Sequence, residues 1–418
     1  MNKLSSLLIV FLISSVNVRA QYTQLPVIPS SVYNIKDDGA VGDNKTLNTE
    51  AIQKALDKAR STGGKVLIPP GEFLCGPLKI YSKTELEIAK GATLRLRNDM
   101  ESFPAANGRY LNFIDISKAT DIKISGGGTI DGQGEPWWKA TEAKTLTLRR
   151  PQIVYIEGTQ RVEISGVTFL NPPNTHVSLK SCTDVYIRDI TIQAPANSHN
   201  TDGINISAKN CTIEHCTINT GDDNIAVNFG NKQQSENDPE VKNMVIKNCT
   251  FGYGHGLSIG SYTSGGLTGL FVSDCTFDGT TSGIRIKTAR GRGGILDNVN
   301  YQNITIKNSR YPIFISEYYP REPKTPQEDV ITTTGDHNPV YKNILLKNIT
   351  VTNSQEGLIL WGIPESPVQR VRFENVQISA KFGAQIYNAA KVEFVNSAIS
   401  AGSGEKVRSY QSSITGLN

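Results

Sequence analysis

Acidic and basic side chains recur at equivalent points of neighbouring short apolar segments in the middle of the chain. Each segment alternates apolar residues with others, as in Gly203-Ile204-Asn205-Ile206 and Asn224-Ile225-Ala226-Val227. If the segments are adjacent parallel strands, the residues two positions before them form a row with a spacing of about 4.8 Å. In chain order these residues are Asp202, Asp223, His255, Ser282 and Tyr311, and Asp222 lies beside Asp223.

Three carboxyl groups in such a row repel one another, so at least one should have a raised pKa and keep its proton near neutral pH. Glycoside hydrolysis needs this combination, because one protonated acid serves the leaving oxygen and one carboxylate activates water. His255 stands between two glycines and next to Asp223, which favours a hydrogen-bond partner that orients an acid. A calcium site or a solvated turn without chemistry are the alternatives, since clustered carboxylates also bind Ca²⁺.

Two cations lie about one coil after His255. Arg285 and Lys287 alternate with Ile284 and Ile286, so both should point outward if the isoleucines face the core. They could be simple ion-pair partners of the acids. Beside a catalytic acid they also suit a substrate that carries carboxylates, because arginine makes a forked contact and lysine supplies a point charge. This pattern favours a uronic acid.

The strands that must position these residues come from a sequence repeat. A pattern of an apolar residue, any residue, an apolar anchor and a polar residue recurs, for example in residues 162–169 and 244–251. Most gaps between anchors are 21 to 29 residues, and the longer gaps contain loops at 134–151, 230–240 and 318–339. This period, with no helical segment between the strands, predicts an all-β parallel β-helix. The anchors are Ile124, Ile164, Ile187, Ile213, Ile246, Val272, Tyr301, Leu346, Phe373 and Phe394.

Two residue types keep fixed positions after the anchors. Cysteines stand three positions after an anchor at Cys216, Cys249 and Cys275, where other coils carry Val or Ile. We expect buried thiols there, with one disulfide left open and no zinc-type spacing. Asn or Asp tolerates the left-handed backbone of a sharp bend and can hydrogen-bond to the next coil, which predicts a ladder. Its members, two positions after the anchors, are Asp189, Asn248, Asp274, Asn303, Asn348, Asn375 and Asn396.

The N-terminal region has its own signals. Residues 48–61 place apolar side chains at helical spacing and are followed by Gly63-Gly64, which predicts a short helix that caps the solenoid. The cap and the first coils should occupy about residues 31–100. Residues 1–20 resemble a signal peptide, with Lys3, an apolar stretch over 4–16 and a cleavage site at Val18-Arg19-Ala20. The apolar stretch is too short to span a bilayer.

We therefore expect residues 21–418 to form one exported β-helix catalytic domain, secreted or periplasmic, without membrane attachment and as a monomer. The 418 residues include 43 Lys plus Arg and 39 Asp plus Glu, a net charge of only +4. A nucleic-acid binder would show a basic stripe or block, so that class is excluded.

Four short segments carry a family resemblance. Asn200-Thr201-Asp202, Gly221-Asp222-Asp223, Gly254-His255-Gly256 and Arg285-Ile286-Lys287 resemble the signature segments of the polygalacturonases, glycoside hydrolase family 28. The resemblance covers nearly the whole mature chain and includes residues 38–43 and 68–71. It implies a right-handed parallel β-helix, no cofactor, and inverting hydrolysis of α-1,4 bonds between galacturonic acid residues in pectin or polygalacturonate.

The resemblance also implies roles for single residues. Asp222 would be the general acid, and Asp202 and Asp223 would hold and deprotonate the attacking water. Asn200 and His255 would support these acids. Arg285 and Lys287 would bind a galacturonate carboxylate beside the scissile bond, and Tyr311 would contact the sugar. Asn224 departs from the family pattern, because many relatives have Cys there, so the cysteine pairing stays open.

Several alternatives remain at this point. The loops at 134–151, with Trp137, Trp138, Arg149 and Arg150, and at 318–339, with Tyr318 and Tyr319, are long enough to shape a cleft. The tryptophans could stack on sugar rings or simply pack over the solenoid. The sequence also leaves open whether the enzyme acts in endo or exo fashion and whether its substrate is a rhamnogalacturonan or xylogalacturonan. Two other functions are possible: a Ca²⁺-dependent pectate lyase and a non-catalytic carbohydrate-binding β-helix.

Overall fold

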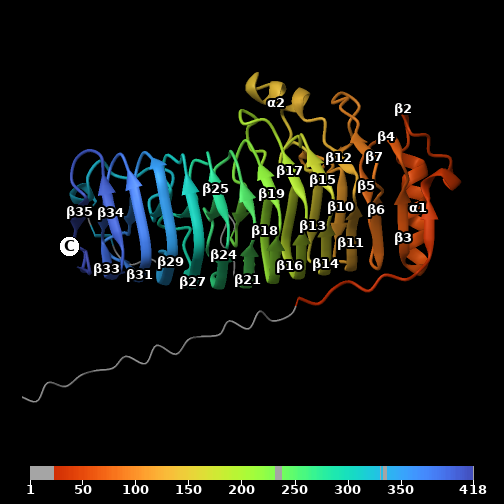
Figure 1. The fold of residues 1–418 in the computed structure, drawn as a ribbon. Coiled ribbons are helices and arrows are strands. Elements are labelled where there is room, and N and C mark those ends of the chain that lie inside the picture. Colours follow the sequence, from red (N-terminus) through yellow and green to blue (C-terminus); the bar gives the residue numbers. More distant parts are fainter. Residues whose placement is uncertain (1–22, 231–237, 330, 333–336, 418) are drawn as a thin grey trace, which may run out of the picture.

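The coils stack into a right-handed parallel β-helix, as the repeat and the resemblance predict (Figure 1). The computed structural model describes residues 23–230, 238–329, 331–332 and 337–417. The predicted signal peptide, residues 1–20, and most of the predicted loop at 230–240 lie outside this part of the chain. Within it, no helix is long and apolar enough to cross a bilayer.

The described strands form three parallel ladders, one along each side of the coil. We call the first the site ladder; it contains β5 (Leu78–Lys79), β10 (Ile114–Ser117), β13 (Val154–Glu157), β16 (Val177–Arg188), β18 (Ile204–Glu214), β20 (Ile225–Val227), β23 (Leu257–Ile259), β26 (Ile284–Lys287), β28 (Ile313–Ser316), β30 (Leu358–Trp361), β32 (Ala384–Tyr387) and β35 (Val407–Tyr410).

The second ladder follows the first bend of each coil, and β16 and β18 run through this bend into it. Its other strands are β1 (Val32–Asn34), β3 (Gly64–Ile68), β6 (Thr84–Ile88), β11 (Thr120–Gly126), β14 (Gln160–Ser165), β21 (Val241–Lys247), β24 (Leu267–Ser273), β27 (Ile295–Lys307), β29 (Val340–Ser354), β31 (Val368–Ala380), β33 (Ala389–Val395) and β36 (Ile414–Thr415).

The third ladder closes the coil, and β27, β29 and β31 reach it from the second. Its other strands are β2 (Asp43–Leu47), β4 (Gly71–Cys75), β7 (Ala92–Leu96), β12 (Thr129–Asp131), β15 (Thr168–Leu170), β17 (Thr191–Gln193), β19 (Thr217–Asn219), β22 (Thr250–Phe251), β25 (Thr276–Asp278) and β34 (Ala398–Ala401). A separate antiparallel pair joins β8 (Ala105–Ala106) and β9 (Arg109–Tyr110).

Inward-facing side chains stack from coil to coil and form the core. In the site ladder, each residue that pairs with Ile204 in the following coils is fully buried: Ile225, Leu257, Ile284 and Ile313. In the third ladder, Phe251 stacks on Phe277 with ring centroids 4.5 Å apart. Because strand residues alternate between faces, burying this inner column fixes which residues face outward.

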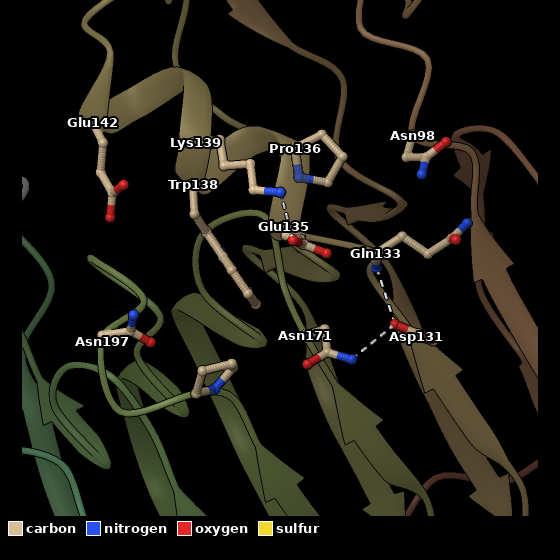
Figure 2. Close-up of a pocket in the computed structure, with 12 residues that line it drawn as sticks. Asn98, Asp131, Gln133, Glu135, Pro136, Trp138, Lys139, Glu142, Asn171 and Asn197 are labelled. Carbon is tan, nitrogen blue, oxygen red and sulfur yellow. Dashed lines mark hydrogen bonds and ion pairs between the residues drawn. The ribbon is translucent and has the colours of Figure 1, made fainter.

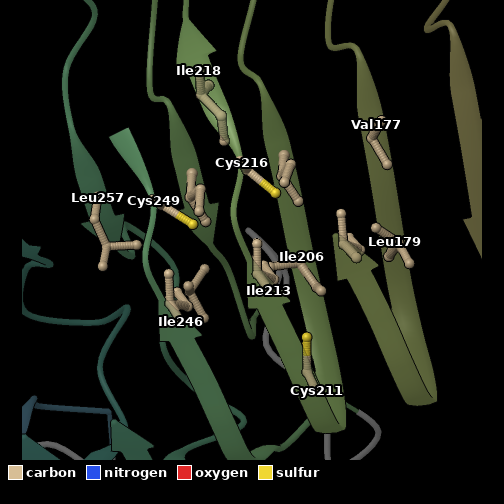
Figure 3. Close-up of a cluster of buried hydrophobic side chains, with 14 of the residues drawn as sticks. Val177, Leu179, Ile206, Cys211, Ile213, Cys216, Ile218, Ile246, Cys249 and Leu257 are labelled. Carbon is tan, nitrogen blue, oxygen red and sulfur yellow. The ribbon is translucent and has the colours of Figure 1, made fainter. Parts of the chain in front are cut away.

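The cysteines belong to this core. All six are buried and unpaired, so the prediction of core thiols is confirmed and the structure forms no disulfide among them. Figure 3 shows Cys216 and Cys249 among Ile213, Ile218 and Ile246, where a small apolar side chain completes the column.

The predicted asparagine ladder is confirmed. All seven residues have a positive φ, between 49° and 55°. Side-chain amides link the coils, with Asn348 Nδ2 donating to Asn303 Oδ1 at 2.9 Å and Asn375 Nδ2 donating to Asn348 Oδ1 at 2.8 Å. A second ladder, which the sequence analysis missed, lies at the preceding bend, where Asn243 donates to Asn210 at 3.1 Å and Asn210 to Asp184 at 3.2 Å.

The predicted capping helix is α1 (Thr49–Thr62), and it covers the N-terminal end of the solenoid (Figure 1). It buries Ile52, Leu56 and two alanines, and its backbone ends at Gly63, which has a φ of 71°. Asn48 precedes it and donates to the carbonyl of Val41 at 3.0 Å, which ties the start of the helix to the first coil. A short 3-10 helix, η1 (Ile35–Asp38), lies before it.

The loop predicted at 134–151 contains a second helix, α2 (Glu135–Glu142), which the sequence analysis did not predict. Pro136 stands in its first turn, and Trp137 is completely buried against Phe103 and Tyr110, with ring centroids 5.3 and 4.8 Å away. Two turns are too short to show a helical period in the sequence, and tertiary packing of one tryptophan fixes the helix instead. The later loop contains a 3-10 turn, η2 (Pro326–Glu328).

The ladder supplies a direct test of what holds the bends together. We expect Asn348→Ala to lower the free energy of unfolding by about 2 kcal/mol. The variant loses two side-chain hydrogen bonds to neighbouring coils, and it forces alanine into a left-handed backbone conformation. Asn348→Gly loses the same bonds without the backbone strain, so its cost should be about 1 kcal/mol. Urea denaturation of both variants measures this difference, and equal costs would show that the backbone conformation contributes nothing.

Candidate active site

The predicted row of titratable side chains exists at the start of the site ladder. Ile204, Ile225, Leu257, Ile284 and Ile313 pair in register through β18, β20, β23, β26 and β28. The turn residues two positions earlier, Asp202, Asp223, His255, Ser282 and Tyr311, therefore occupy equivalent places on five successive coils, which confirms the predicted register.

Asp223 is the most enclosed of the three carboxylates, with 5% of its surface exposed. Its Oδ1 accepts hydrogen bonds from Arg285 Nη1 at 2.9 Å and Ser258 Oγ at 2.7 Å, and its Oδ2 accepts one from Lys287 Nζ at 2.8 Å. Burial by itself would raise the pKa of Asp223, but Lys287, His255 and Arg285 outweigh that effect and hold the pKa well below its usual range. Asp223 is therefore ionised at neutral pH.

Asp202 behaves in the opposite way. Burial, followed by repulsion from Asp222 and Asp223, raises the pKa of Asp202 to about 8. Asn205 Nδ2 donates a hydrogen bond to Asp202 Oδ2 at 3.4 Å. The cluster thus holds a proton at neutral pH, as the sequence predicts for at least one member. The proton therefore lies on Asp202, where burial and the negative charges of Asp222 and Asp223 hold it.

Asp222 lies between a cation and an amide. His255 Nδ1 lies 3.1 Å from Asp222 Oδ1, and Asn200 Nδ2 donates to Asp222 Oδ2 at 3.4 Å. Hydrogen bonds to Asp222 and then Asp223 raise the pKa of His255 to about 9, so the imidazole is protonated at neutral pH. About a quarter of the Asp222 side chain remains exposed, which leaves it accessible to a substrate from outside.

Arg150 and His176, which the sequence analysis did not place in the site, hydrogen-bond to the turn that contains Asn200 and Asp202. Arg150 is buried, donates through Nη2 to Asn200 Oδ1 at 3.0 Å, and through Nη1 to the carbonyls of Pro173 and His199 at 2.8 and 2.9 Å. His176 is completely buried, and its Nδ1 lies 2.9 Å from the carbonyl oxygen of Asp202. Burial lowers the pKa of His176 to about 4, so the ring is neutral.

Tyrosines line the cleft beyond the cations. Tyr311, Arg285 and Tyr319 share the wall of a hollow of about 360 Å³ with Trp361. The ring of Tyr319 lies over both cations, with its centroid 5.1 Å from Lys287 Nζ and 5.8 Å from Arg285 Cζ. The sequence analysis singled out this loop but gave Tyr319 no partner, because the approach of the loop to the cations depends on its path.

Arg290 anchors the same loop to the solenoid. Its Nη2 donates to Asp329 Oδ2 at 2.7 Å and to Glu365 Oε2 at 2.8 Å. Tyr318 also donates to Asp329, at 2.5 Å, and is buried against Trp361. These contacts fix the position from which Tyr319 covers Arg285 and Lys287.

The two neighbouring tryptophans have different surroundings. Trp137 is a packing residue. Trp138 is partly exposed, and Figure 2 shows it below α2 in a hollow of about 560 Å³, with its Nε1 donating to the carbonyl of Pro172 at 2.9 Å. None of the eight predicted site residues lines this hollow.

Known proteins share both this sequence and this architecture. The family model of glycosyl hydrolases family 28 matches residues 60–400. The chain belongs to this family. An endo-polygalacturonase of Pectobacterium carotovorum subsp. carotovorum is 33% identical over 388 residues, which cover 87% of this chain and 90% of the relative. An exopolygalacturonase of Zea mays is 31% identical, with 84% of each chain covered.

A solved structure supports the same assignment. The polygalacturonase from Erwinia carotovora ssp. carotovora matches with a TM-score of 0.75 and 31% identity, over 88% of this chain and 97% of that one. The chain is therefore a family 28 glycoside hydrolase, and the row of carboxyl groups is its candidate active site.

The acids of this family 28 chain fit a divalent cation poorly. Asp222, Asp223 and His255 each offer one ligand atom, and these atoms lie within 4.8 Å of one another. However, both oxygens of Asp223 already bind cationic donors, and His255 is held protonated, so its ring donates rather than coordinates. A metal would have to displace Arg285 and Lys287, which disfavours the calcium alternative.

The raised pKa of Asp202 has a cost in stability at neutral pH. The pKa of Asp202 is raised above its unfolded value of 3.8, so the native state keeps a proton that the unfolded chain releases between about pH 4 and pH 8. Stability from this group is complete below pH 4 and is lost as the pH rises toward 8. We expect Asp202→Asn to raise the free energy of unfolding on the order of 2 kcal/mol at pH 7 and to leave it unchanged near pH 4. Thermal unfolding at both pH values measures this, and a pH-independent effect would contradict the raised pKa.

Proposed function

We propose that this family 28 enzyme hydrolyses α-1,4-glycosidic bonds between galacturonic acid residues in polygalacturonate, the unesterified form of pectin. The observation that carries the proposal is the charge arrangement around Asp223. Arg285 and Lys287 stand beside the acids on the outer face of β26, where the carboxylate of a uronic acid next to the scissile bond can bind both. Relatives named for endo- and exo-polygalacturonase activity support the same substrate.

The proposed roles follow the state of each carboxyl group. About a quarter of the Asp222 side chain is exposed to the cleft, so Asp222 takes the role of the general acid that serves the leaving oxygen. Asp223 stays ionised and, together with Asp202 once that residue has released its proton, holds and deprotonates the attacking water. Asn200 and His255 fix the orientation of Asp222, while Tyr311 contacts a sugar on the side of the cations.

We further propose that hydrolysis inverts the anomeric configuration. The Asp222 and Asp223 atoms lie within 4.8 Å, a separation closer to that of retaining enzymes. A retaining mechanism, however, needs a free carboxylate nucleophile, and the oxygens of Asp223 are bound by Ser258, Arg285 and Lys287. Such a carboxylate can orient water but is a poor nucleophile. NMR of the first product formed tests this, since an α-configured first product would contradict inversion.

We also propose that the protein is exported and acts as a monomer, because residues 1–20 have the features of a signal peptide and the site is complete within one chain. The N-terminal sequence of the purified exported protein tests the cleavage after Ala20. A mature chain that starts at Met1 would contradict it.

The substrate is tested by incubating the mature protein with de-esterified polygalacturonate in excess chelator and resolving the products by size over time. We expect saturated products without added metal. Oligomers of mixed length would establish endo action, and monomer or dimer beside intact polymer would establish exo action. Unsaturated products, or products only after calcium is restored, would overturn the hydrolase proposal in favour of a lyase.

The general acid is tested by Asp222→Asn. We expect turnover to fall by at least about 100-fold while the polymer still binds, because the amide cannot donate a proton in place of the carboxylic acid. Asp57→Asn, on the exposed face of α1, is the matched control and should keep full activity. A variant of Asp222 with normal turnover would contradict the assignment.

A further inference from the structure

The hollow below α2 lies beside the row of acids. Its floor is formed where strands of the third ladder end, by Asp131 at the end of β12, Asn171 after β15 and Pro195 after β17. A separate hollow of about 390 Å³ lies on the site-ladder side of α2, where Arg150 and Gln152 contribute to its lining. The two hollows share no lining residue. A ligand bound below α2 therefore leaves the row of acids open.

One side of α2 supplies the wall of this hollow. Glu135, Trp138 and Glu142 follow one another at spacings of three and four residues, so they project from the same side of the helix. Figure 2 shows the ring of Trp138 pointing from α2 down into the hollow. The buried ring of Trp137 holds α2 against Phe103 and Tyr110, so the wall has a fixed position.

Trp138 is held as a rigid, partly exposed platform. Its Nε1 donates to the carbonyl of Pro172 at 2.9 Å, so the only polar group of the side chain already has a partner. A Cβ atom at Gly134 would lie 2.8 Å from Cε2 of the ring, so the absence of a side chain at Gly134 makes room for the indole. The exposed part of the ring presents an apolar aromatic surface. Such a surface suits the C–H face of a sugar ring.

Planar amides surround this platform. Gln133 Nε2 donates to the carbonyl of Leu96 at 2.6 Å, and Asn171 Nδ2 donates to Asp131 Oδ1 at 3.4 Å, which leaves the carbonyl oxygen of each amide as an acceptor. Two exposed amides add donors as well as acceptors. Sugar hydroxyl groups need both kinds of partner. The amides that line the hollow are Asn98, Gln133, Asn171 and Asn197.

The charge of the hollow excludes an acidic sugar. Three carboxylates line it, Asp131, Glu135 and Glu142, against one cation, Lys139, whose Nζ lies 2.6 Å from Glu135 Oε1. A uronic acid carboxylate would be repelled here, in contrast to the surroundings of Arg285. Within the described part of the chain, these three carboxylates do not come close enough together to hold a metal ion. An uncharged polar ligand fits the lining.

We propose that the hollow below α2 binds a neutral sugar unit, carried either as a branch of the acidic polymer or in a separate uncharged polysaccharide. Trp138 stacks against the sugar ring, and the amides and carboxylates bond its hydroxyl groups. The volume of about 560 Å³ accommodates a sugar of this class. The site adds a second binding specificity to the enzyme and does not depend on cleavage of polygalacturonate.

Affinity electrophoresis of the mature protein tests the site, with soluble galactan, arabinan, xylan or polygalacturonate as the probe in the gel. We expect at least one neutral polymer to retard the wild-type protein and Trp138→Ala to weaken that binding at least about 10-fold. Trp138→Phe keeps an aromatic ring and should retain most of the affinity. Tyr81→Ala removes a partly exposed ring beside α1 and is the matched control.

A second variant separates loss of the site from displacement of α2. Asn197→Ala alters the wall outside α2, and we expect it to weaken binding of the same polymer about 5-fold. The source of the sugar follows from KM. A branch predicts that Trp138→Ala raises KM for pectin with neutral side chains relative to KM for polygalacturonate, whereas a separate polysaccharide predicts the same ratio as in the wild-type protein.

Three results would overturn the inference. They are no retardation by any of the neutral polymers, unchanged binding in both Trp138→Ala and Asn197→Ala, and displacement of the bound neutral polymer by galacturonate oligomers. The measurement needs no turnover, so it remains valid if the protein fails to cleave polygalacturonate. Failure of the proposed function and failure of this site are therefore distinguishable.

Discussion

Repulsion among three carboxyl groups held about one coil apart is the interaction on which the rest of the site depends. The parallel register fixes the distance between Asp202 and Asp223 on adjacent coils. Asp222 precedes Asp223 directly in the sequence, so it cannot move away from the other two. The repulsion is relieved by a different environment for each acid. Arg285 and Lys287 form ion pairs with Asp223, and His255 forms one with Asp222. Asp202 keeps a proton instead. One ionised and one protonated carboxyl group are the states that acid–base hydrolysis requires.

The remainder of the molecule keeps that spacing rigid. The inner column of isoleucines and phenylalanines fixes which residues face the cleft, and the asparagine ladders hold the bends in a left-handed conformation. Outside the solenoid, Arg290 secures the loop that carries Tyr319, and buried Trp137 secures α2.

Features that depend on the coil register could be predicted from the sequence, and features that depend on loop paths could not. The alternation around Ile204, Ile225 and Leu257 was sufficient to place Asp202, Asp223 and His255 in one row. The second asparagine ladder could also have been predicted, because Asn210 and Asn243 occupy equivalent positions at the preceding bend. The sequence analysis did not predict it. Nothing local predicted that Arg150 and His176 would reach the turn of the acids, or which carboxyl would hold the proton, because burial and long-range contacts decide both.

The most direct test of this account is a titration of the aspartate carboxyl carbons by ¹³C NMR, with Asp202→Asn used to assign the signals. The account predicts one carboxyl that titrates near pH 8 and disappears in the variant, and another, Asp223, that remains ionised down to the pH at which the protein unfolds. A cluster in which all three carboxyl groups titrate near pH 4 would contradict it, because the cluster would then hold no proton at neutral pH.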